Sequence, residues 1–416
     1  MDYEEGDYVE VEFKGEKIRG IIMPKHSFSG EDILLLKLDN GYNIGIKKDH
    51  INNIKIISKK IIEEKTYTVK REIKKEGKKV TIINTGGTIA SFIDYKTGAV
   101  KPAKTQEELL LLMPELTENY NINGINLFSI LSENIEPEHW VEIARNVYRE
   151  IKNSDSIIIT HGTDTMAYSA SMIAFMIQNL SSPVIFVGSQ RSSDRPSSDA
   201  YMNLLYSLKL SYTDLGEVVV SMHGSTSDDY LLVHRGVKVR KMHTSRRDAF
   251  KSINTFPIAK IDNEGVKFLS EYIKRSDNPI LMDKIEKKVS LLYFYPNMDP
   301  EILHDIGSRV KGIILAGTGL GHVSTKLLET LRDLIKNDVF IGVTSQCLYG
   351  TVNLNVYSTG REMLKAGIIP LGDMLPEVAY VKLMWVLGNG FDPKETMPKN
   401  LVGELTDRRV GYEYRI

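Results

Sequence analysis

Short segments of apolar and polar residues in alternation dominate the first 72 residues of the chain. Tyr8–Phe13 alternates with a period of two, and three further short apolar runs follow at 20–23, 33–38 and 42–46. Asp39-Asn40-Gly41, between the last two runs, is typical of a tight hairpin turn. Closely spaced short strands with tight turns predict a small β-barrel. Since residues 1–72 hold no cluster of nucleophiles or metal ligands, we interpret them as a docking module.

Buried-strand patterns alternate with polar turns and helix patterns from residue 80 onward. The stretch 80–91, VTIINTGGTIAS, begins as an apolar β-branched run and breaks at Gly86 and Gly87, where a ligand could approach the backbone closely. Comparable apolar runs predict strands at 125–131, 156–159 and 184–188. Helices are predicted at 105–113, from Pro137 and from Met166. This alternation predicts a doubly wound catalytic α/β domain over residues 80–274.

Two polar stretches divide the chain. Residues 55–79 contain ten Lys or Arg against four Glu, and the linker itself is predicted at 73–79. The basic excess fits either a solvated linker or a strip that faces a partner or an RNA backbone. Residues 275–287 form the second predicted linker. Beyond it the strand–helix alternation resumes, which predicts a smaller, doubly wound α/β domain over 288–416.

Composition is that of an ordinary globular protein. The 416 residues are 42% hydrophobic and 26% charged, and the formal net charge of -1 argues against polyanion binding by bulk charge. A single cysteine excludes an internal disulfide framework and indicates a reducing compartment. The acidic N-terminus does not resemble a secretory signal, and no apolar run is long enough to span a membrane. We therefore expect a cytoplasmic protein.

Hydroxyl groups gather where the predicted strands end, and open α/β sheets place their ligand crevices at such ends. They belong to Thr85, Thr88, Ser132 and Thr163. A threonine hydroxyl attacks only after a base removes its proton. His161 is close in sequence, although its place at a strand end favours a structural role; a lysine of lowered pKa is the other candidate base. No Cys and His spacing is typical of a metal site, so no metal is expected.

Two short motifs resemble the paired signatures of the bacterial-type L-asparaginases. They are TGGTIA at 85–90 and HGTDTM at 161–166, and the similarity continues through 241–245, 249–252, 346–350 and 355–361. The resemblance covers roughly residues 78 to 410 and implies threonine-dependent amide hydrolysis. It implies that Thr88 is the primary nucleophile and that Thr163 and Asp164 form a second catalytic pair. Lys241 matches the lysine that completes a Thr–Asp–Lys arrangement.

The same resemblance implies a set of substrate-binding residues. Ser132 matches a residue that binds the α-carboxylate of the substrate, and we assign Glu133 to the same site. Asp164 is implied to lie near the α-amino group. The glycine turn at Gly87 can present backbone donors to an oxyanion.

Two departures from that family concern a tyrosine and a carboxylate. Tyr95 is the nearest candidate for the tyrosine of the family's mobile loop, but it is out of register. The secreted subgroup supplies an acidic residue to a neighbouring subunit, whereas residues 353–361 contain no carboxylate. The region resembles the cytoplasmic subgroup.

Nearly eighty residues precede the segment 80–91 that carries the glycine turn, and residues 190–199 read QRSSDRPSSD. Both features resemble the D subunits of archaeal glutamyl-tRNA(Gln) amidotransferases. That resemblance implies a glutaminase that supplies ammonia to a partner E subunit, which converts Glu-tRNA(Gln) to Gln-tRNA(Gln). It implies that ATP and magnesium bind to the partner, that this chain holds no cofactor, and that tRNA is bound mainly by the partner. It also implies self-association through the asparaginase-like body, within a heterodimer or heterotetramer.

Three alternatives remain open from the sequence. The chain could be a free-standing cytoplasmic L-asparaginase with an accessory N-terminal domain. It could be a cysteine-dependent glutaminase that uses Cys347, although a lone cysteine with apolar neighbours is expected in the core. It could also be an amino-acid sensor without catalytic activity on the same fold.

Overall fold

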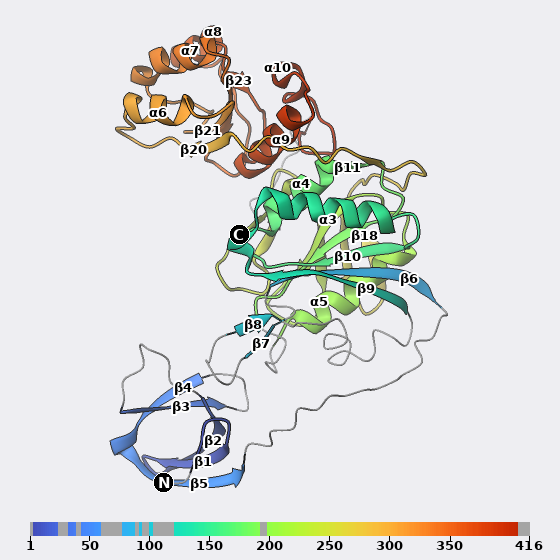
Figure 1. Cartoon of the computed structure of the whole chain (residues 1–416), viewed down its shortest axis with the longest axis vertical. Helices are drawn as coiled ribbons and strands as arrows, with labels where there is room; N and C mark the ends of the chain where they lie inside the picture. The colour runs from blue at the N-terminus through green and yellow to red at the C-terminus, as the bar shows by residue number, and fades with distance from the viewer. Residues whose placement is uncertain are drawn as a thin grey trace.

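The computed structural model describes residues 3–23, 32–38, 43–59, 77–87, 91–93, 100–102, 120–191 and 198–406 (Figure 1). Several sequence expectations lie outside these ranges: the turn at 39–41, the helix at 105–113, Thr88 and Tyr95. Among the described residues, no helix combines the length and apolarity that a bilayer crossing requires.

The N-terminal residues form an antiparallel five-stranded sheet in the order β4-β3-β2-β1-β5. Its strands are β1 (Tyr8–Phe13), β2 (Glu16–Ile22), β3 (Ile33–Leu38), β4 (Asn43–Lys47) and β5 (Ile51–Ser58). Val9 and Val11 are fully buried on one face, as the alternation in β1 predicts. Among the described residues, β5 pairs with β1 and no pairing joins it to β4, so the sheet is shown without the closure of a barrel.

The next domain is built on a mixed eight-stranded sheet in the order β18-β17-β14-β13-β12-β10-β6-β9. Its parallel strands are β6 (Lys78–Gly86), β9 (Tyr120–Ile130), β10 (Ser156–Thr160), β12 (Val184–Val187) and β13 (Val218–His223). An antiparallel edge follows, made of β14 (Leu231–Arg235), β17 (Ala259–Asp262) and β18 (Gly265–Phe268). Along the sheet the parallel strands run in the chain order 2-1-3-4-5, so the winding reverses between β6 and β10.

The boundary predicted for β9 was wrong by five residues at its start. The strand begins at Tyr120 rather than at 125. It lies at the edge of the sheet, where Tyr120 and Ile122 are buried and the alternating Asn121 and Asn123 are not. An edge strand needs only one apolar residue in two, so a search for a continuous apolar run misses its first half.

Helices cover both faces of this sheet. Figure 1 shows α3 (Pro137–Glu150) and α4 (Met166–Met176) on one face and α5 (Ala200–Ser207) on the other. Helices α3 and α4 begin at the predicted residues. Helix α4 has no polar face, because it lies between the sheet and α9 (Pro376–Gly388) of the next domain and is buried on all sides. The two domains therefore share one hydrophobic core.

The C-terminal domain contains a parallel sheet in the order β20-β21-β22-β23. These strands are β20 (Val289–Tyr293), β21 (Gly312–Gly317), β22 (Phe340–Ser345) and β23 (Ile369–Pro370). One face packs on α6 (Pro300–Gly307), α7 (Leu328–Lys336) and α8 (Ser358–Ala366), and the other packs on α9. A short helix, α10 (Pro393–Thr396), follows α9.

Three two-stranded ribbons complete the described structure. They are β7 (Ser91–Ile93) with β8 (Val100–Pro102), β11 (Ile177–Gln178) with β19 (Ile280–Leu281), and β15 (Val239–Lys241) with β16 (Phe250–Ser252). The ribbon of β15 and β16 matters most for the site, because Lys241 is its last paired residue on β15.

Candidate active site

The turns that follow β6 and β10 touch each other where the winding of the sheet reverses. Gly86 and Gly87 have φ values of 103° and 82°, a region that glycine enters without steric cost. A Cβ atom on Gly87 would lie 2.4 Å from the backbone nitrogen of Gly162. A Cβ atom on Gly86 would lie 2.5 Å from the carbonyl oxygen of Ile130. The close approach of this turn to Gly162 and to the end of β9 therefore requires glycine at both positions.

Side-chain hydrogen bonds fix the two strand ends against each other. The Thr85 hydroxyl donates to the carbonyl oxygen of Thr160 at 2.7 Å. The Thr160 hydroxyl donates to Asn84 Oδ1 at 2.8 Å, and the same oxygen accepts the Gly86 N–H at 3.1 Å. Thr85, one of the hydroxyls noted from the sequence, therefore serves the backbone of the turn.

Lys241 meets the second turn from a distant part of the chain. Its Nζ donates to Thr163 Oγ1 at 2.8 Å and to Asp164 Oδ1 at 2.7 Å. The side chain of Lys241 is only 12% exposed, whereas that of Asp164 is 69% exposed. Three of the predicted catalytic residues thus form one connected group. The Lys241 amine and the Thr163 hydroxyl are within the hydrogen-bond reach that proton transfer between two groups requires.

Ser132 packs against the same turn from the end of β9. It begins the short helix η3 (Ser132–Asn134) and is 5% exposed. A Cβ atom on Gly162 would lie 2.9 Å from Ser132 Oγ, and the Thr165 hydroxyl donates to the Ser132 carbonyl oxygen at 2.7 Å. Glu133 follows it in η3 and is exposed. The structure therefore packs both Ser132 and Gly87 against Gly162.

Gly188 is a site residue that the sequence reasoning missed. It follows β12, and a Cβ atom there would lie 2.8 Å from both Thr163 Cγ2 and the His161 carbonyl oxygen. The available signal was a glycine directly after a buried strand, in the same position as Gly87 after β6. That pattern marks a place where another backbone or side chain approaches closely.

His161 has a structural role in the hydrogen-bond pattern. It is fully buried, with Nδ1 2.7 Å from the Gly162 carbonyl oxygen and Nε2 2.9 Å from Ser169 Oγ. Trp140 Nε1 donates to the same Ser169 oxygen at 2.8 Å. A single neutral tautomer of His161 satisfies these hydrogen bonds, with Nδ1–H donating and Nε2 accepting. Neither nitrogen is free to act as a base for Thr163.

Burial lowers the pKa of His161 to about 4, and this makes stability depend on pH. Between that value and the ordinary pKa of 6.5, the unfolded chain binds a proton that the folded chain does not. The free energy of unfolding should therefore fall by about 2 to 3 kcal/mol through this group as the pH drops from 7 to 4.5. Urea unfolding of the wild type and His161→Gln at both pH values measures the contribution. An identical pH dependence in the two proteins would contradict it.

Cys347 lies on the surface, in the loop after β22. The expectation of a buried core cysteine was therefore wrong. The apolar pattern before it belongs to the strand, which ends at Ser345, and the Cys347 N–H donates to the Ser345 hydroxyl at 3.0 Å. The thiol is thus part of a turn that has already left the core.

Metal-ligating side chains do not gather in the part of the chain that the structure describes. No group of three or more His, Cys, Asp or Glu residues there could hold a metal ion.

Three family models match successive parts of this chain. "GatD N-terminal domain" matches residues 3–57, "Asparaginase, N-terminal" matches 79–274, and "Glutaminase/Asparaginase C-terminal domain" matches 288–397. Two curated relatives are both described as the D subunit of glutamyl-tRNA(Gln) amidotransferase. The protein from Saccharolobus solfataricus is 49% identical over 99% of this chain and 94% of its own length. That from Pyrococcus furiosus is 50% identical over 97% of this chain and 95% of its own length.

Solved structures of L-asparaginases resemble the two α/β domains. The enzyme from Thermococcus kodakarensis has a TM-score of 0.74 and 32% identity, and the match covers 79% of this chain and all of that one. L-Asparaginase I from Vibrio cholerae has a TM-score of 0.68 and 28% identity over 80% of this chain and all of its own.

Proposed function

Because this chain belongs to the family of glutamyl-tRNA(Gln) amidotransferase D subunits, we propose a mechanism for the glutaminase site that such a protein carries. It is the glutaminase component of a tRNA-dependent amidotransferase, an amidohydrolase of the asparaginase type. The observation that carries the mechanism is the contact of Lys241 Nζ with both Thr163 and Asp164, next to the turn that leads into Thr88.

In the proposed first step, the Thr88 hydroxyl oxygen bonds to the side-chain amide carbon of glutamine. Its proton leaves the hydroxyl and reaches the departing amide nitrogen, so that ammonia is released and a glutamyl ester remains on Thr88. In the second step, a water activated at Thr163 and Lys241 attacks the ester carbon. Glutamate leaves, and the Thr88 hydroxyl regains a proton.

The neighbouring residues are proposed to hold the substrate. Ser132, buried beside Gly162, binds the α-carboxylate, and Glu133 belongs to the same end of the site. The exposed carboxylate of Asp164 lies near the α-amino group. The backbone at Gly87, in the turn that packs directly against Gly162, is proposed to supply a donor to the developing oxyanion.

We propose that the ammonia passes to a partner E subunit, which amidates Glu-tRNA(Gln) with ATP and magnesium. The D-subunit relatives support a partner in a multisubunit amidotransferase. The formal net charge of -1 supports a tRNA held mainly by that partner. In this proposal the assembly is cytoplasmic, and the asparaginase-like body self-associates.

We also propose that the N-terminal sheet closes into the small docking barrel that its strand pattern predicts. The support is its single buried face, formed by residues such as Val9, Val11 and Leu36. The match of residues 3–57 to a domain described for this family favours docking within the amidotransferase.

Ammonia release tests the function directly. The purified chain should be assayed with glutamine and with asparagine, alone and with the E subunit and Glu-tRNA(Gln). We expect glutamine to be preferred and its hydrolysis to rise when the partner and charged tRNA are present. Fast asparagine hydrolysis that ignores the partner would instead support a free L-asparaginase, and binding without ammonia release would support a sensor.

A further inference from the structure

The ribbon that carries Lys241 is anchored to the C-terminal domain at its open end. Lys238 ends the short helix η5 (Gly236–Lys238) directly before β15, and its carbonyl oxygen accepts the Ile253 N–H at 2.8 Å. Its Nζ donates to Asp373 Oδ2 at 2.7 Å, across 135 positions of sequence. The two side chains are 2% and 9% exposed. A buried ammonium is therefore held by one carboxylate from the other domain.

A second anchor lies two residues beyond the facing strand of the ribbon, β16. Asn254 follows Ile253, is 5% exposed and has a φ of 55°. Its Oδ1 accepts the Gly350 N–H at 2.9 Å, and its Nδ2 donates to the Gly350 carbonyl oxygen at 3.2 Å. Both strands of the ribbon are thus tied to the C-terminal domain at the same end.

Alternation along β15 separates the anchoring residues from the catalytic lysine. Arg240 Nη1 lies 3.4 Å from Glu377 Oε2, at the start of α9, so residues 238 and 240 both reach carboxylates of the C-terminal domain. Residues one position apart on a strand point to opposite sides. Lys241 accordingly points away from these carboxylates, toward Thr163 and Asp164.

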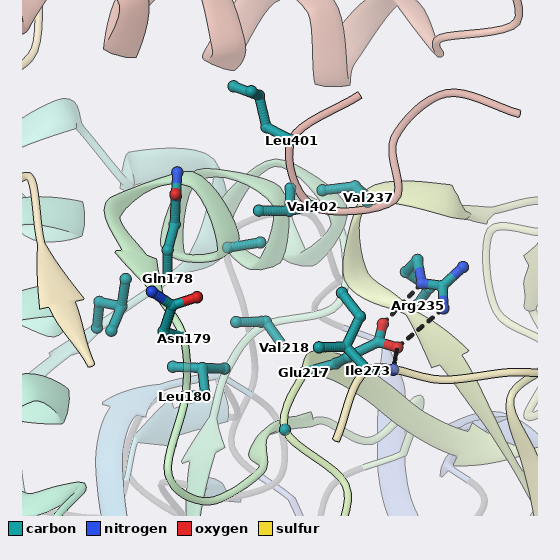
Figure 2. Close-up of a pocket in the computed structure, with 13 residues that line it drawn as sticks. Gln178, Asn179, Leu180, Glu217, Val218, Arg235, Val237, Ile273, Leu401 and Val402 are labelled. Carbon is teal, nitrogen blue, oxygen red and sulfur yellow. Dashed lines mark hydrogen bonds and ion pairs between the residues drawn. The ribbon is translucent and has the colours of Figure 1, made fainter. Parts of the chain in front are cut away.

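The C-terminal segment 397–406 completes the anchor. The Thr406 hydroxyl donates to Asp373 Oδ2 at 2.6 Å and its N–H to Oδ1 at 3.0 Å, so Asp373 accepts from two directions. Four residues before Thr406, Val402 lines a pocket with Leu401, Val237 and Arg235 (Figure 2). The segment therefore packs along the residues that lead into Lys238.

A buried ion pair fixes the segment on its other side. Glu404 Oε1 accepts from Lys382 Nζ of α9 at 2.6 Å, and both side chains are fully buried. The Glu404 carboxylate also accepts the N–H groups of Leu401 and Val402. Since α9 carries both Lys382 and Glu377, the segment and the ribbon are fixed to the same helix.

We infer that Asp373 and Lys238 are positioning residues for Lys241: the C-terminal domain and the segment 397–406 set the place of β15, and so the place of the Lys241 amine against Thr163. The inference rests on the catalytic role proposed for Lys241. A displacement of about 1 Å at a reacting group can cost about 100-fold in rate, so even a small shift of the ribbon should be measurable.

Two substitutions test the inference in the full chain with glutamine. Asp373→Asn removes the charge that holds Lys238, and Thr406→Val removes one hydroxyl donor at nearly constant volume. We expect kcat to fall about 10- to 100-fold in Asp373→Asn and about 3- to 10-fold in Thr406→Val, with KM within about twofold. Asp155→Asn is the matched control. It removes a carboxylate charge from the Lys78–Asp155 ion pair, which lies at the end of the large sheet opposite to Thr163. Its kcat should be unchanged.

The measurements are made below the unfolding temperature of each variant, so that all chains are folded. A folded Asp373→Asn with the kcat of the wild type would overturn the inference, because a purely structural anchor affects stability alone. If Asp373→Asn does not fold, a folded Thr406→Val with the kcat of the wild type would overturn the inference. Lys241→Met separates the catalytic role of Lys241 from the positioning role of Asp373 and Lys238. Full activity in that variant would refute the proposed catalytic role itself. An inactive Lys241→Met beside normal kcat in both test variants would refute only the positioning role.

Discussion

Replacing Lys241 with methionine should lower kcat for glutamine hydrolysis by about 1000-fold, within the range that positioned proton transfer contributes. Methionine keeps an unbranched apolar stem, which suits a side chain that is only 12% exposed. It has no amine, so it can neither accept nor donate a proton. The Thr163 hydroxyl would lose its 2.8 Å contact with the amine, and water could no longer be activated through it. The measurement is ammonia release at saturating glutamine.

The matched control for this variant is Lys260→Met. Lys260 also forms an ion pair with an aspartate, Asp262 at 3.0 Å, but it lies on the antiparallel edge of the large sheet. Its removal should leave kcat unchanged. A Lys241→Met protein that retains more than about a tenth of the wild-type kcat would contradict the assignment.

Thr88→Ala should abolish glutamine hydrolysis, a loss of about 10,000-fold or more in kcat, because the covalent route loses its nucleophile. Thr88 itself lies outside the described residues. The residue before it, Gly87, contacts Gly162 in the turn that carries Thr163, and this is the structural support for a shared site. Glutamine turnover and the mass of the acid-quenched protein would be measured together, since only a chain with the nucleophile can carry a glutamyl adduct.

Two variants make this prediction specific. Thr88→Ser keeps a hydroxyl and should retain measurable turnover, whereas Cys347→Ala should leave activity nearly intact, because the exposed thiol lies in the turn after β22. Loss of activity in Cys347→Ala together with full activity in Thr88→Ala would favour the cysteine-dependent alternative.

The strand ends that form the site followed from local patterns. Apolar runs that end in glycines or hydroxyls predicted β6, β10 and β12, and parallel strands bring such ends to one edge of a sheet. The starts of both helices on one face of the sheet were also predicted from the sequence. A proline marked the start of α3, and the return of apolar residues after a polar turn marked the start of α4. These features depend on neighbours that are close along the chain.

Features that depend on distant parts of the chain were not readable in the same way. The meeting of Lys241 with Thr163 spans 78 positions, and only the family resemblance indicated it. The Lys238–Asp373 pair spans 135 positions, and no motif marks either residue. Cys347 was misplaced because its apolar neighbours suggested a core, while the turn that exposes it depends on where β22 ends.

The partnership of Lys238 with Asp373 and Thr406 has a consequence for protein synthesis. During synthesis, the ribbon that carries Lys241 is completed long before Asp373, the partner of Lys238, is added. Thr406 is added later still. On the inference that Asp373 positions Lys241, a chain that ends before Asp373 would carry all the proposed catalytic residues and still be a poor catalyst. On the positioning role inferred for Asp373, glutamine hydrolysis by nascent chains would stay slow until the C-terminal domain has folded against the catalytic domain.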